Sequence, residues 1–404
     1  MEPNQTSAPQ SGRHRDAARE FDLVLYGASG FVGALTAAYL ADHAPPGLRW
    51  ALAGRDGAKL ERTRASLGLA DVPVLTAEAG DARALRELAA RTRVVATTVG
   101  PYLRYGDALV GACADAGTDY ADLTGEPEFV DRSYLRHEAR ARATGARLVH
   151  GCGFDSVPAD LGVLFTVGRL PEGVPLRVDG FLSVDAAPSG GTVDSTLTAL
   201  GRPLAMARAA RERAAVEPAP APGRRISAPP GPPRYVGELG AWALPLPVLD
   251  PLFVARSARA LPRYGPDFRY RHHVTARSLP AALAGLTGAA ALLTAAQLPP
   301  LRRALSSRLA PGTGPGEERR ARSAFSLRFI GEGGGRRVYT EVRGGDPGYD
   351  ETARILGESA LSLALDDLPA SSGQLTPAVA MGEALTGRLR RSGLMVREAA
   401  RREG

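Results

Sequence analysis

Short apolar runs alternate with segments of helical periodicity from residue 21 to about residue 149. This rhythm is typical of βαβ units, whose strands lie side by side in one parallel sheet. Strands are expected at residues 21–26, 50–54, 72–75, 93–99, 119–123 and 146–150, and helices at 31–41, from 57, from 82, and at 106–116 and 127–144. Six strands in this order predict an α/β fold with a doubly wound parallel (Rossmann) sheet.

The rhythm changes beyond residue 173, and the later elements predict a second, α+β domain. Residues 174–184 alternate like a half-buried strand, and 323–332 and 336–344 flank a run of three glycines, which favours an antiparallel hairpin. Helices are expected at 192–215, 350–368 and 376–391, and residues 216–233, rich in Pro, Ala and Gly, are expected to be a linker.

One apolar stretch differs from every other part of the chain. Residues 278–301 carry no charge over 24 positions, and Arg277, Arg302 and Arg303 bracket them. The length would suffice for a membrane span, but the many Ala, Gly, Thr and Pro residues make the stretch only weakly hydrophobic. We favour a buried or surface-lying helix, with an interfacial helix and a true span as the open alternatives.

Composition removes several classes of function. Lys59 is the only lysine among 50 basic residues, which disfavours catalysis by lysine. The excess of arginine most simply reflects a GC-rich coding sequence, so no nucleic-acid partner is predicted. Two cysteines, Cys113 and Cys152, and six scattered histidines indicate neither a disulfide framework nor a metal site. The polar residues 1–20 are expected to form a disordered arm, and the protein is expected to be cytoplasmic.

The strongest motif follows the first strand and opens a helix. Its residues are Gly27, Ala28, Ser29, Gly30, Phe31, Val32 and Gly33. In this context a first glycine permits the tight turn, a second lets backbone amides approach a pyrophosphate, and a third allows close packing of helix on sheet. The spacing GxxGxxG departs by one residue from the commonest dinucleotide pattern and is frequent in NADP-binding domains.

The end of the second strand indicates the type of cofactor. An NAD enzyme usually carries Asp or Glu there, whereas this chain has Arg55, with Lys59 one turn into the next helix. A guanidinium group can pair with a 2′-phosphate, so the predicted cofactor is NADPH. The alternative is that Arg55 is an ordinary surface charge.

Three glycine-containing loops follow the fourth, fifth and sixth strands, where a nicotinamide would lie. The first begins with Val99, Gly100 and Pro101, the second holds residues 122–126, and the third includes Gly153 and Phe154. Tyr102, Tyr105 and Asp155 are the candidate catalytic residues in these loops. Aromatic packing of the tyrosines, and helix capping by Asp155 or Ser156, are the alternative interpretations.

At these loops the chain resembles a known family. The segments GASGFVG, AGR, VGPYLRYG, DYADLTGE and GCGFDSVPADLG, followed by GGDPGYDETA and LTPAVAMGEALTGRLRRSGL, resemble the saccharopine dehydrogenase-like oxidoreductases, especially the bacterial trans-acting enoyl reductases. The resemblance covers residues 21–394. It implies an NADP-binding domain at 21–172, a domain at 173–374 that closes over the substrate, and a C-terminal helix and tail at 375–404.

The resemblance also implies a reaction, in which an α,β-unsaturated acyl chain on a polyketide synthase or carrier protein is reduced. That chemistry needs hydride at Cβ, a stabilised enolate oxygen and a proton at Cα. The chain has no Tyr-x-x-x-Lys pair, so Tyr102 is the first candidate proton donor, Tyr105 the second, and Asp155 an orienting group. Imine chemistry as in true saccharopine reductases, and a non-catalytic lipid-associated role, are the rival interpretations.

Charge is unevenly distributed and bears on the partner. Residues 202–308 hold 16 arginines and five acids, within a chain of net charge +7. A cationic rim that includes Arg256, Arg259 and Arg263, beside the apolar residues 278–301, suits an acidic carrier protein. The same features suit a peripheral contact with an anionic membrane. No signal in the sequence sets the oligomeric state.

Overall fold

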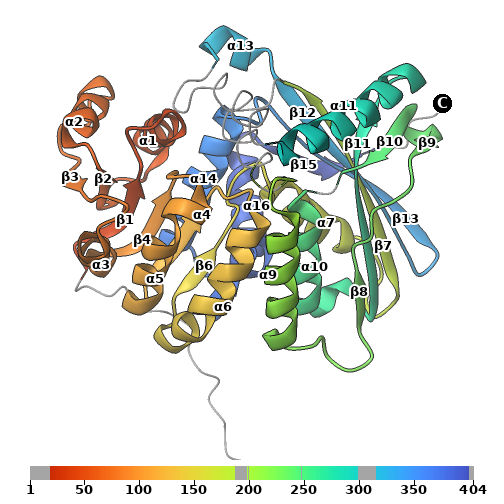
Figure 1. Cartoon of the computed structure of the whole chain (residues 1–404), viewed down its shortest axis with the longest axis horizontal. Coiled ribbons are helices and arrows are strands. Elements are labelled where there is room, and N and C mark those ends of the chain that lie inside the picture. The colour runs from red at the N-terminus through yellow and green to blue at the C-terminus, as the bar shows by residue number, and fades with distance from the viewer. Residues whose placement is uncertain (1–18, 187–197, 199, 247, 299–314, 400–404) are drawn as a thin grey trace, which may run out of the picture.

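The computed structural model describes residues 19–186, 198, 200–246, 248–298 and 315–399. Two sheets lie side by side, with helices between and around them (Figure 1). The first sheet is parallel and the second is mixed, which confirms the predicted Rossmann sheet with a second α+β unit. The expected N-terminal arm lies outside the described residues apart from Arg19 and Glu20.

Seven parallel strands form the first sheet. Across the sheet their order is β14 (Gly373–Leu375), β6 (Arg147–Val149), β5 (Asp119–Asp122), β4 (Thr92–Thr97), β1 (Phe21–Tyr26), β2 (Trp50–Gly54) and β3 (Val74–Thr76). The strand order reverses at β1, which pairs with β2 on one side and β4 on the other. Ligands of doubly wound sheets bind above the carboxyl ends of the strands at such a reversal.

Helices cover both faces of this sheet. One face carries α3 (Ala82–Arg91), α5 (Asp107–Ala116) and α6 (Pro127–Thr144), and the other carries α1 (Phe31–His43) and α14 (Asp350–Leu365). Leu23 and Leu25 of β1 join the core on the α1 and α14 side, whereas Val24 and Tyr26 join the α3 and α5 side. Because both faces are buried, the strands are continuous apolar runs, which made them visible in the sequence.

The second sheet has eight strands. Seven lie in the order β15 (Met395–Glu398), β13 (Arg336–Gly344), β12 (Ala324–Gly333), β7 (Leu176–Asp185), β11 (Asp267–Ala276), β10 (Ala241–Pro245) and β9 (Arg234–Val236), and β8 (Arg225–Ser227) pairs with β11. The hairpin of β12 and β13 is confirmed. Two helices, α7 (Val157–Val167) and α10 (Asp250–Ala260), pack against the face that points toward the first sheet.

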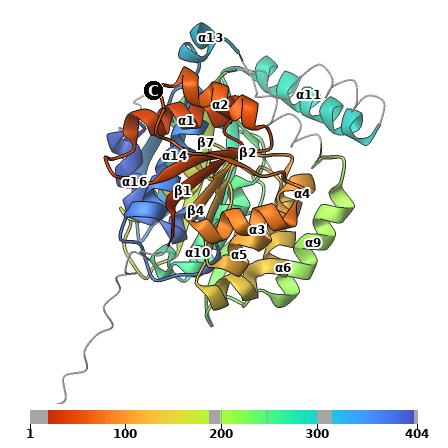
Figure 2. The same cartoon turned by 90° about the vertical axis from the view of Figure 1, so that its left-hand side faces the viewer.

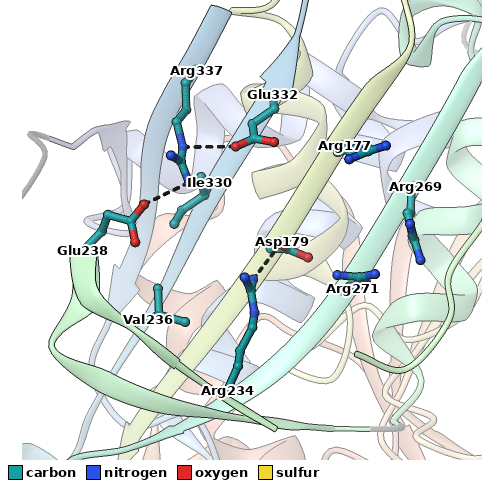
Figure 3. Close-up of a pocket in the computed structure, with 10 residues that line it drawn as sticks. All are labelled: Arg177, Asp179, Arg234, Val236, Glu238, Arg269, Arg271, Ile330, Glu332 and Arg337. Atoms are coloured by element: carbon teal, nitrogen blue, oxygen red, sulfur yellow. Dashed lines mark hydrogen bonds and ion pairs between the residues drawn. The ribbon is translucent and has the colours of Figure 1, made fainter. Parts of the chain in front are cut away.

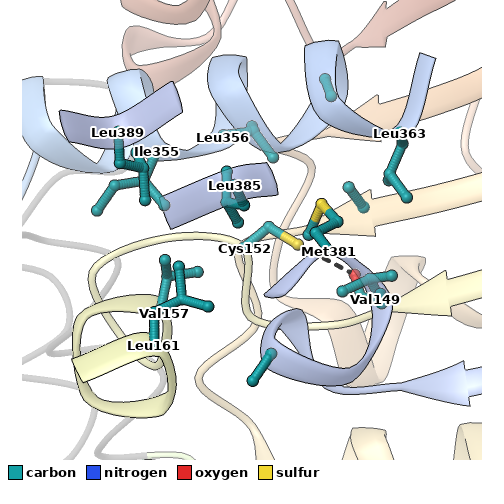
Figure 4. Packing of buried hydrophobic residues seen from close by; sticks show 14 of the residues in the cluster. Val149, Cys152, Val157, Leu161, Ile355, Leu356, Leu363, Met381, Leu385 and Leu389 are labelled. Carbon is teal, nitrogen blue, oxygen red and sulfur yellow. Dashed lines mark hydrogen bonds between the residues drawn. The ribbon is translucent and has the colours of Figure 1, made fainter. Parts of the chain in front are cut away.

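One hydrophobic core joins the two halves of the molecule. Figure 4 shows its centre, where side chains from the end of β6, from α7, from α14 and from α16 (Gly382–Arg391) meet around Cys152 and Met381. Both cysteines are buried and free. The predicted helix over 376–391 is two helices, α15 (Pro377–Ala380) and α16, separated at Met381.

Other elements differ from the sequence prediction. Residues 216–233 are not only a linker, because they contain β8. Part of the helix expected at 192–215 lies outside the described residues, and the helix that the structure shows there is α9 (Pro203–Val216). Strand β14 was not predicted from the sequence, since three residues are too few to show a period of two.

The apolar segment forms α11 (Leu279–Gln297), which lies on the surface and projects from the molecule (Figure 2). Leu279, Leu283 and Leu286 are exposed by 47, 55 and 39%, while Ala282 is buried. The helix is therefore surface-lying rather than buried, because much of it faces outward, and among the described elements it packs mainly on β10 and β11. Across the described ranges, no helix is both long and apolar enough to cross a bilayer.

Candidate active site

The glycine-rich turn lies at the carboxyl end of β1. Gly27 has a φ of 91°, and a Cβ there would lie 2.7 Å from Val99 Cγ2. A Cβ on Gly33 would lie 2.1 Å from the carbonyl oxygen of Gly27, so that position also excludes a side chain. These two glycines let the turn pack against the loop after β4 and let α1 pack on the turn.

Gly30 differs from the other two glycines. Its backbone has ordinary extended angles, and a Cβ there would have only the Gly27 carbonyl oxygen as a neighbour, at 3.3 Å. Gly30 precedes α1 without a side-chain cap, and the first turn of α1 has no acidic residue. The backbone N–H groups of that turn therefore suit a pyrophosphate, so the turn fits a dinucleotide cofactor.

The residues after β2 bear on the 2′ position of such a cofactor. Arg55 is exposed, and its side chain forms no hydrogen bond or ion pair with any residue in the ranges given above. Asp56 is a carboxylate that the sequence analysis passed over. It caps α2 (Gly57–Ser66) by accepting from the Lys59 backbone N–H at 3.0 Å, and it also lies 4.0 Å from Lys59 Nζ.

Tyr102 begins the short helix α4 (Tyr102–Tyr105) and faces inward, only 5% exposed. Its hydroxyl donates to the Thr97 carbonyl oxygen at 3.2 Å and accepts from the Leu123 N–H at 3.1 Å. Burial raises the Tyr102 pKa well above its usual value, and the nearby Asp122 carboxylate adds to this. In this position the hydroxyl holds the loops after β4 and β5 together. Tyr105, at the other end of α4, is half-buried.

Glu126 fixes the start of α4, a role that the sequence did not suggest. Its two carboxylate oxygens accept from the backbone N–H groups of Tyr102 and Leu103, at 2.8 and 2.9 Å. The side chain is 1% exposed. The loop after β5 therefore positions the loop after β4, which includes Val99, Gly100 and Pro101.

Asp122 organises the next two loops and is fully buried at the end of β5. One carboxylate oxygen accepts from the backbone N–H groups of Thr124 at 3.1 Å and Gly151 at 2.9 Å. The other accepts from the Tyr120 hydroxyl at 2.9 Å and lies 2.7 Å from Nδ1 of His150. This network ties the loop after β5 to the loop after β6.

The loop after β6 is where the two halves of the chain meet. Phe154 packs edge-on against Phe325 of β12, with ring centroids 4.7 Å apart, and its N–H donates to Thr352 Oγ1 of α14 at 3.3 Å. A Cβ on Gly153 would lie 2.7 Å from Leu123 Cδ2. Ser156 precedes α7 but does not cap it, because its hydroxyl donates to the Gly151 carbonyl oxygen at 2.6 Å.

Asp155 is half-buried beside these contacts, and its carboxyl group is unusual. Burial alone raises its pKa to about 6. A carboxyl group with that pKa keeps its proton in about a tenth of molecules at pH 7, far more often than an ordinary aspartate does, and can act as a general acid.

Asp250, at the start of α10, lies near Asp155. Burial raises the Asp250 pKa well above its usual value, and the charge of Asp155 raises it further. Oδ2 of Asp250 is 4.0 Å from Nε2 of His272, whose Nδ1 lies 2.6 Å from the Tyr270 hydroxyl. Burial lowers the His272 pKa to about 3, so the imidazole is neutral. These contacts connect Asp155 to groups of α10 and the second sheet, which the sequence did not predict.

The C-terminal half also reaches the glycine-rich turn. Tyr349 packs edge-on against Phe31, with ring centroids 5.0 Å apart. Arg320 lies over the other side of the same motif, 5.6 Å from the Phe31 ring centre, and pairs with Asp350 at 2.8 Å. The segment 344–353 therefore lies beside the turn, although nothing in its local pattern indicated this.

The cationic rim expected from Arg256, Arg259 and Arg263 is not there. Arg256 is mostly buried and donates to Asp131, Arg259 pairs with Glu217 at 3.0 Å, and an Arg263 N–H donates to the Leu170 carbonyl oxygen. This expectation was wrong because the sequence shows the number of arginines but not which carboxylates and carbonyls they meet in the fold.

Comparison with known proteins gives the family. Residues 23–149 match the family model described as the saccharopine dehydrogenase NADP-binding domain. Trans-acting enoyl reductases of Mycobacterium bovis and Mycobacterium leprae are 36% identical to the chain, each alignment covering 94% of it and 98 and 97% of the relative. A Mycobacterium tuberculosis protein provisionally named a trans-acting enoyl reductase is 40% identical, and the alignment covers 93% of this chain and 97% of that protein. The chain belongs to the trans-acting enoyl reductase family.

A solved structure supports the fold of this family. Saccharopine dehydrogenase (L-Glu forming) from Saccharomyces cerevisiae superposes with a TM-score of 0.56 at 14% identity, covering 94% of this chain and 99% of that one. The resemblance, the oxidoreductase class and the nicotinamide cofactor predicted from the sequence are thus confirmed. The individual site residues remain predictions.

Proposed function

We propose that the protein reduces the α,β double bond of a carrier-bound enoyl thioester with NADPH. The observation that carries this proposal is the meeting of these loops at one edge of the first sheet. A glycine-rich turn suited to a dinucleotide lies at the same edge of the sheet as a partly buried carboxyl group with a raised pKa. The names of the family members supply the acyl substrate class.

The residues from Gly27 to Gly33 would hold the pyrophosphate, with Ala28, Ser29, Phe31 and Val32 forming the rest of the turn. Val99, Gly100 and Pro101, together with Gly153 and Phe154, would border the nicotinamide. When bound, the reduced cofactor supplies a hydride. These loops are fixed relative to one another by Glu126 and Asp122, which favours a preorganised site.

Arg55 and Lys59 support NADPH rather than NADH as the cofactor. Arg55 is exposed at the end of β2, and the nearby carboxylate of Asp56 is engaged at the start of α2. A 2′-phosphate would gain a charge-assisted hydrogen bond there, for which about 1.5 to 3 kcal/mol is usual. Titration of both cofactors should show NADPH binding more tightly, and Arg55→Ala should weaken NADPH alone. Equal affinities in the wild type would contradict this preference.

Among the three candidate catalytic residues, the geometry favours Asp155 as the proton donor to Cα. Tyr102 has its hydroxyl engaged by the backbone at Thr97 and Leu123, which favours a positioning role. Asp155 lies on the loop that meets the second sheet, close enough to Asp250 for its charge to raise the Asp250 pKa. Tyr105 stays the alternative donor.

The surface helix α11 supports contact with an apolar partner. It has exposed leucines and no charged residue over its length. We favour the acyl chain of the carrier-bound substrate as that partner, with the anionic membrane surface as the alternative. Leu283→Gln with Leu286→Gln should raise the KM for long-chain enoyl substrates. If the double variant changes only sedimentation with anionic vesicles, the membrane is the partner.

The proposed function is tested by following NADPH oxidation in three separate assays. The first two use a short enoyl thioester and the same enoyl group on a carrier protein. The third uses an amino acid together with a keto acid, which form an imine. Turnover of the two enoyl substrates, with the carrier-bound one preferred, is the expected result. Turnover of the imine-forming pair alone would replace the proposal with saccharopine-type chemistry.

A further inference from the structure

A basic pocket lies on the second sheet, on the face opposite α7 and α10. In β7, Val178 points into the shared core, so Arg177 and Asp179 point the other way. In β11, Tyr270 points into that core, so Arg269 and Arg271 also lie on the opposite face. The pocket has a volume of about 200 Å³, and five arginines and three carboxylates line it (Figure 3).

The three carboxylates are already paired with two of the arginines, and the five arginines exceed the three carboxylates by two charges. Asp179 pairs with Arg234 at 2.8 Å. Glu238 and Glu332 both pair with Arg337, at 2.9 and 3.2 Å. Figure 3 shows these pairs along one side of the pocket.

Three arginines remain on the other side, namely Arg177, Arg269 and Arg271. None of them forms an ion pair or side-chain hydrogen bond with another residue of the described chain. Their guanidinium groups lie near one another between β7 and β11 (Figure 3). Among the described residues, the pocket therefore holds an excess of positive charge, located around these three arginines.

Strand register makes this excess unfavourable without a ligand. Arg177 is directly opposite Arg269 of β11 on one side and Glu332 of β12 on the other, and Arg271 is directly opposite Asp179. Like charges directly opposite on one face of a sheet repel each other. In addition, Nε of Arg271 and Nε of Arg234 are buried without a hydrogen-bond partner, and a buried N–H donor left unsatisfied is costly.

The neighbouring hollow on the same face shows that the excess is local. There Glu341 accepts from Arg328 at 3.3 Å and from Arg397 at 2.9 Å, and also from the Ser326 hydroxyl at 2.8 Å. A carboxylate thus pairs with both of those arginines. Arg177 has Glu332 opposite it on β12, but that carboxylate is paired with Arg337, and Arg269 has no carboxylate partner among the described residues. The missing negative charge is what a ligand would supply.

We propose that this pocket binds a small phosphate-bearing anion with two or more negative charges. Guanidinium groups form paired hydrogen bonds to phosphate oxygens, and three of them converge here. The volume is below the roughly 300 to 1,000 Å³ of sites for larger organic ligands, which suits a phosphate or pyrophosphate group. The site is separate from the cofactor crevice, and its existence does not depend on the proposed enoyl reduction.

Calorimetric titration of the full-length protein with inorganic pyrophosphate, at low salt and with the crevice saturated by NADP⁺, tests the proposal. One saturable site is expected, with its affinity lowered at least tenfold in Arg269→Gln and in Arg177→Gln. Arg336→Gln, an exposed arginine of β13 outside the pocket, is the matched control and should bind as the wild type does. The affinity for NADP⁺ should be the same in all four proteins.

A parallel arm uses vesicles of a neutral phospholipid with phosphatidic acid added, to separate a free phosphate compound from a lipid head group. Binding of pyrophosphate in solution supports the proposal, whereas binding to the vesicles alone overturns it in favour of a lipid surface. Three other results would also overturn it. Arg269→Gln could bind pyrophosphate as tightly as the wild type, Arg336→Gln could lose as much affinity as the pocket variants, or the wild type could show no binding at all. Without ligand, Arg177→Gln should melt no lower than the wild type, because it removes a repulsion.

Discussion

Buried carboxylates lie on both sides of the crevice, and their surroundings differ. On the side of the first sheet, Asp122 and Glu126 accept hydrogen bonds from backbone N–H groups of neighbouring loops. On the side that meets the second sheet, burial is the only cause of the raised Asp155 pKa, and it is the largest cause for Asp250. The first pair is surrounded by donors, and the second pair lies in surroundings that disfavour its charge.

This difference separates structural from chemical roles. A carboxylate that accepts several N–H groups is stable as an anion and fixes the loops that donate to it. A carboxyl group that is desolvated without such donors retains its proton to higher pH and can give it to a substrate. We therefore expect the two sets to respond in opposite ways to substitution and to pH.

The largest effect is expected from Asp155→Asn on turnover. Loss of the proton donor should lower kcat for an enoyl thioester by roughly 100-fold or more, the usual range for a general acid. The wild-type kcat should fall as pH rises through about 6, the pKa of this carboxyl group, and the variant should lack that dependence. Steady-state kinetics over a pH series measures both. The exposed Asp185→Asn serves as the control, and an unchanged kcat in Asp155→Asn would assign the donor elsewhere.

A large loss of stability is expected from Asp122→Ala. The substitution leaves His150, Tyr120 and two backbone N–H groups without their buried acceptor. The free energy of unfolding should fall by about 3 to 5 kcal/mol, as when one partner of a buried charged pair is removed. Denaturant unfolding measures it, with the exposed Asp71→Ala as control. A loss below about 1 kcal/mol would show that this network does not hold the loops.

A smaller effect, of opposite sign, is expected for the stability of Asp155→Asn. Because the folded-state pKa is raised to about 6, ionisation of Asp155 above that pH destabilises the wild type, and this penalty is absent below the unfolded-state pKa. The variant should therefore unfold like the wild type near pH 4 and gain on the order of 2 kcal/mol at pH 8. Chemical denaturation at both pH values shows the difference. A variant less stable at pH 8 would mean that the carboxylate is held by donors after all.

The smallest effect on turnover is expected from Tyr102→Phe. The change removes the hydroxyl that bridges Thr97 and Leu123 but keeps the ring that packs near Phe129. About 1 to 3 kcal/mol of stability should be lost, and kcat should fall by less than tenfold. A fall comparable to that of Asp155→Asn would instead make Tyr102 the proton donor.

The part of the site that the sequence predicted comes from short segments. The glycine-rich turn, Arg55 and the loops after β4 to β6 follow buried strands directly, and a parallel sheet aligns their ends. Asp250 and His272 could not be found this way, because they come close to Asp155 through the packing of α10 on α7 and β11. Likewise β14 joins the first sheet from more than 200 residues beyond its neighbour β6, at a register set only by the fold.

The central claim is that hydride from the cofactor and a proton from the protein are added across an acyl double bond. Its most direct test is mass spectrometry of a carrier-bound enoyl substrate after incubation with NADPH carrying deuterium at the transferable position. The account predicts a saturated acyl chain with one deuterium at Cβ and a solvent-derived hydrogen at Cα, formed slowly by Asp155→Asn. An unchanged enoyl chain, or deuterium found only in an amine product, would contradict it.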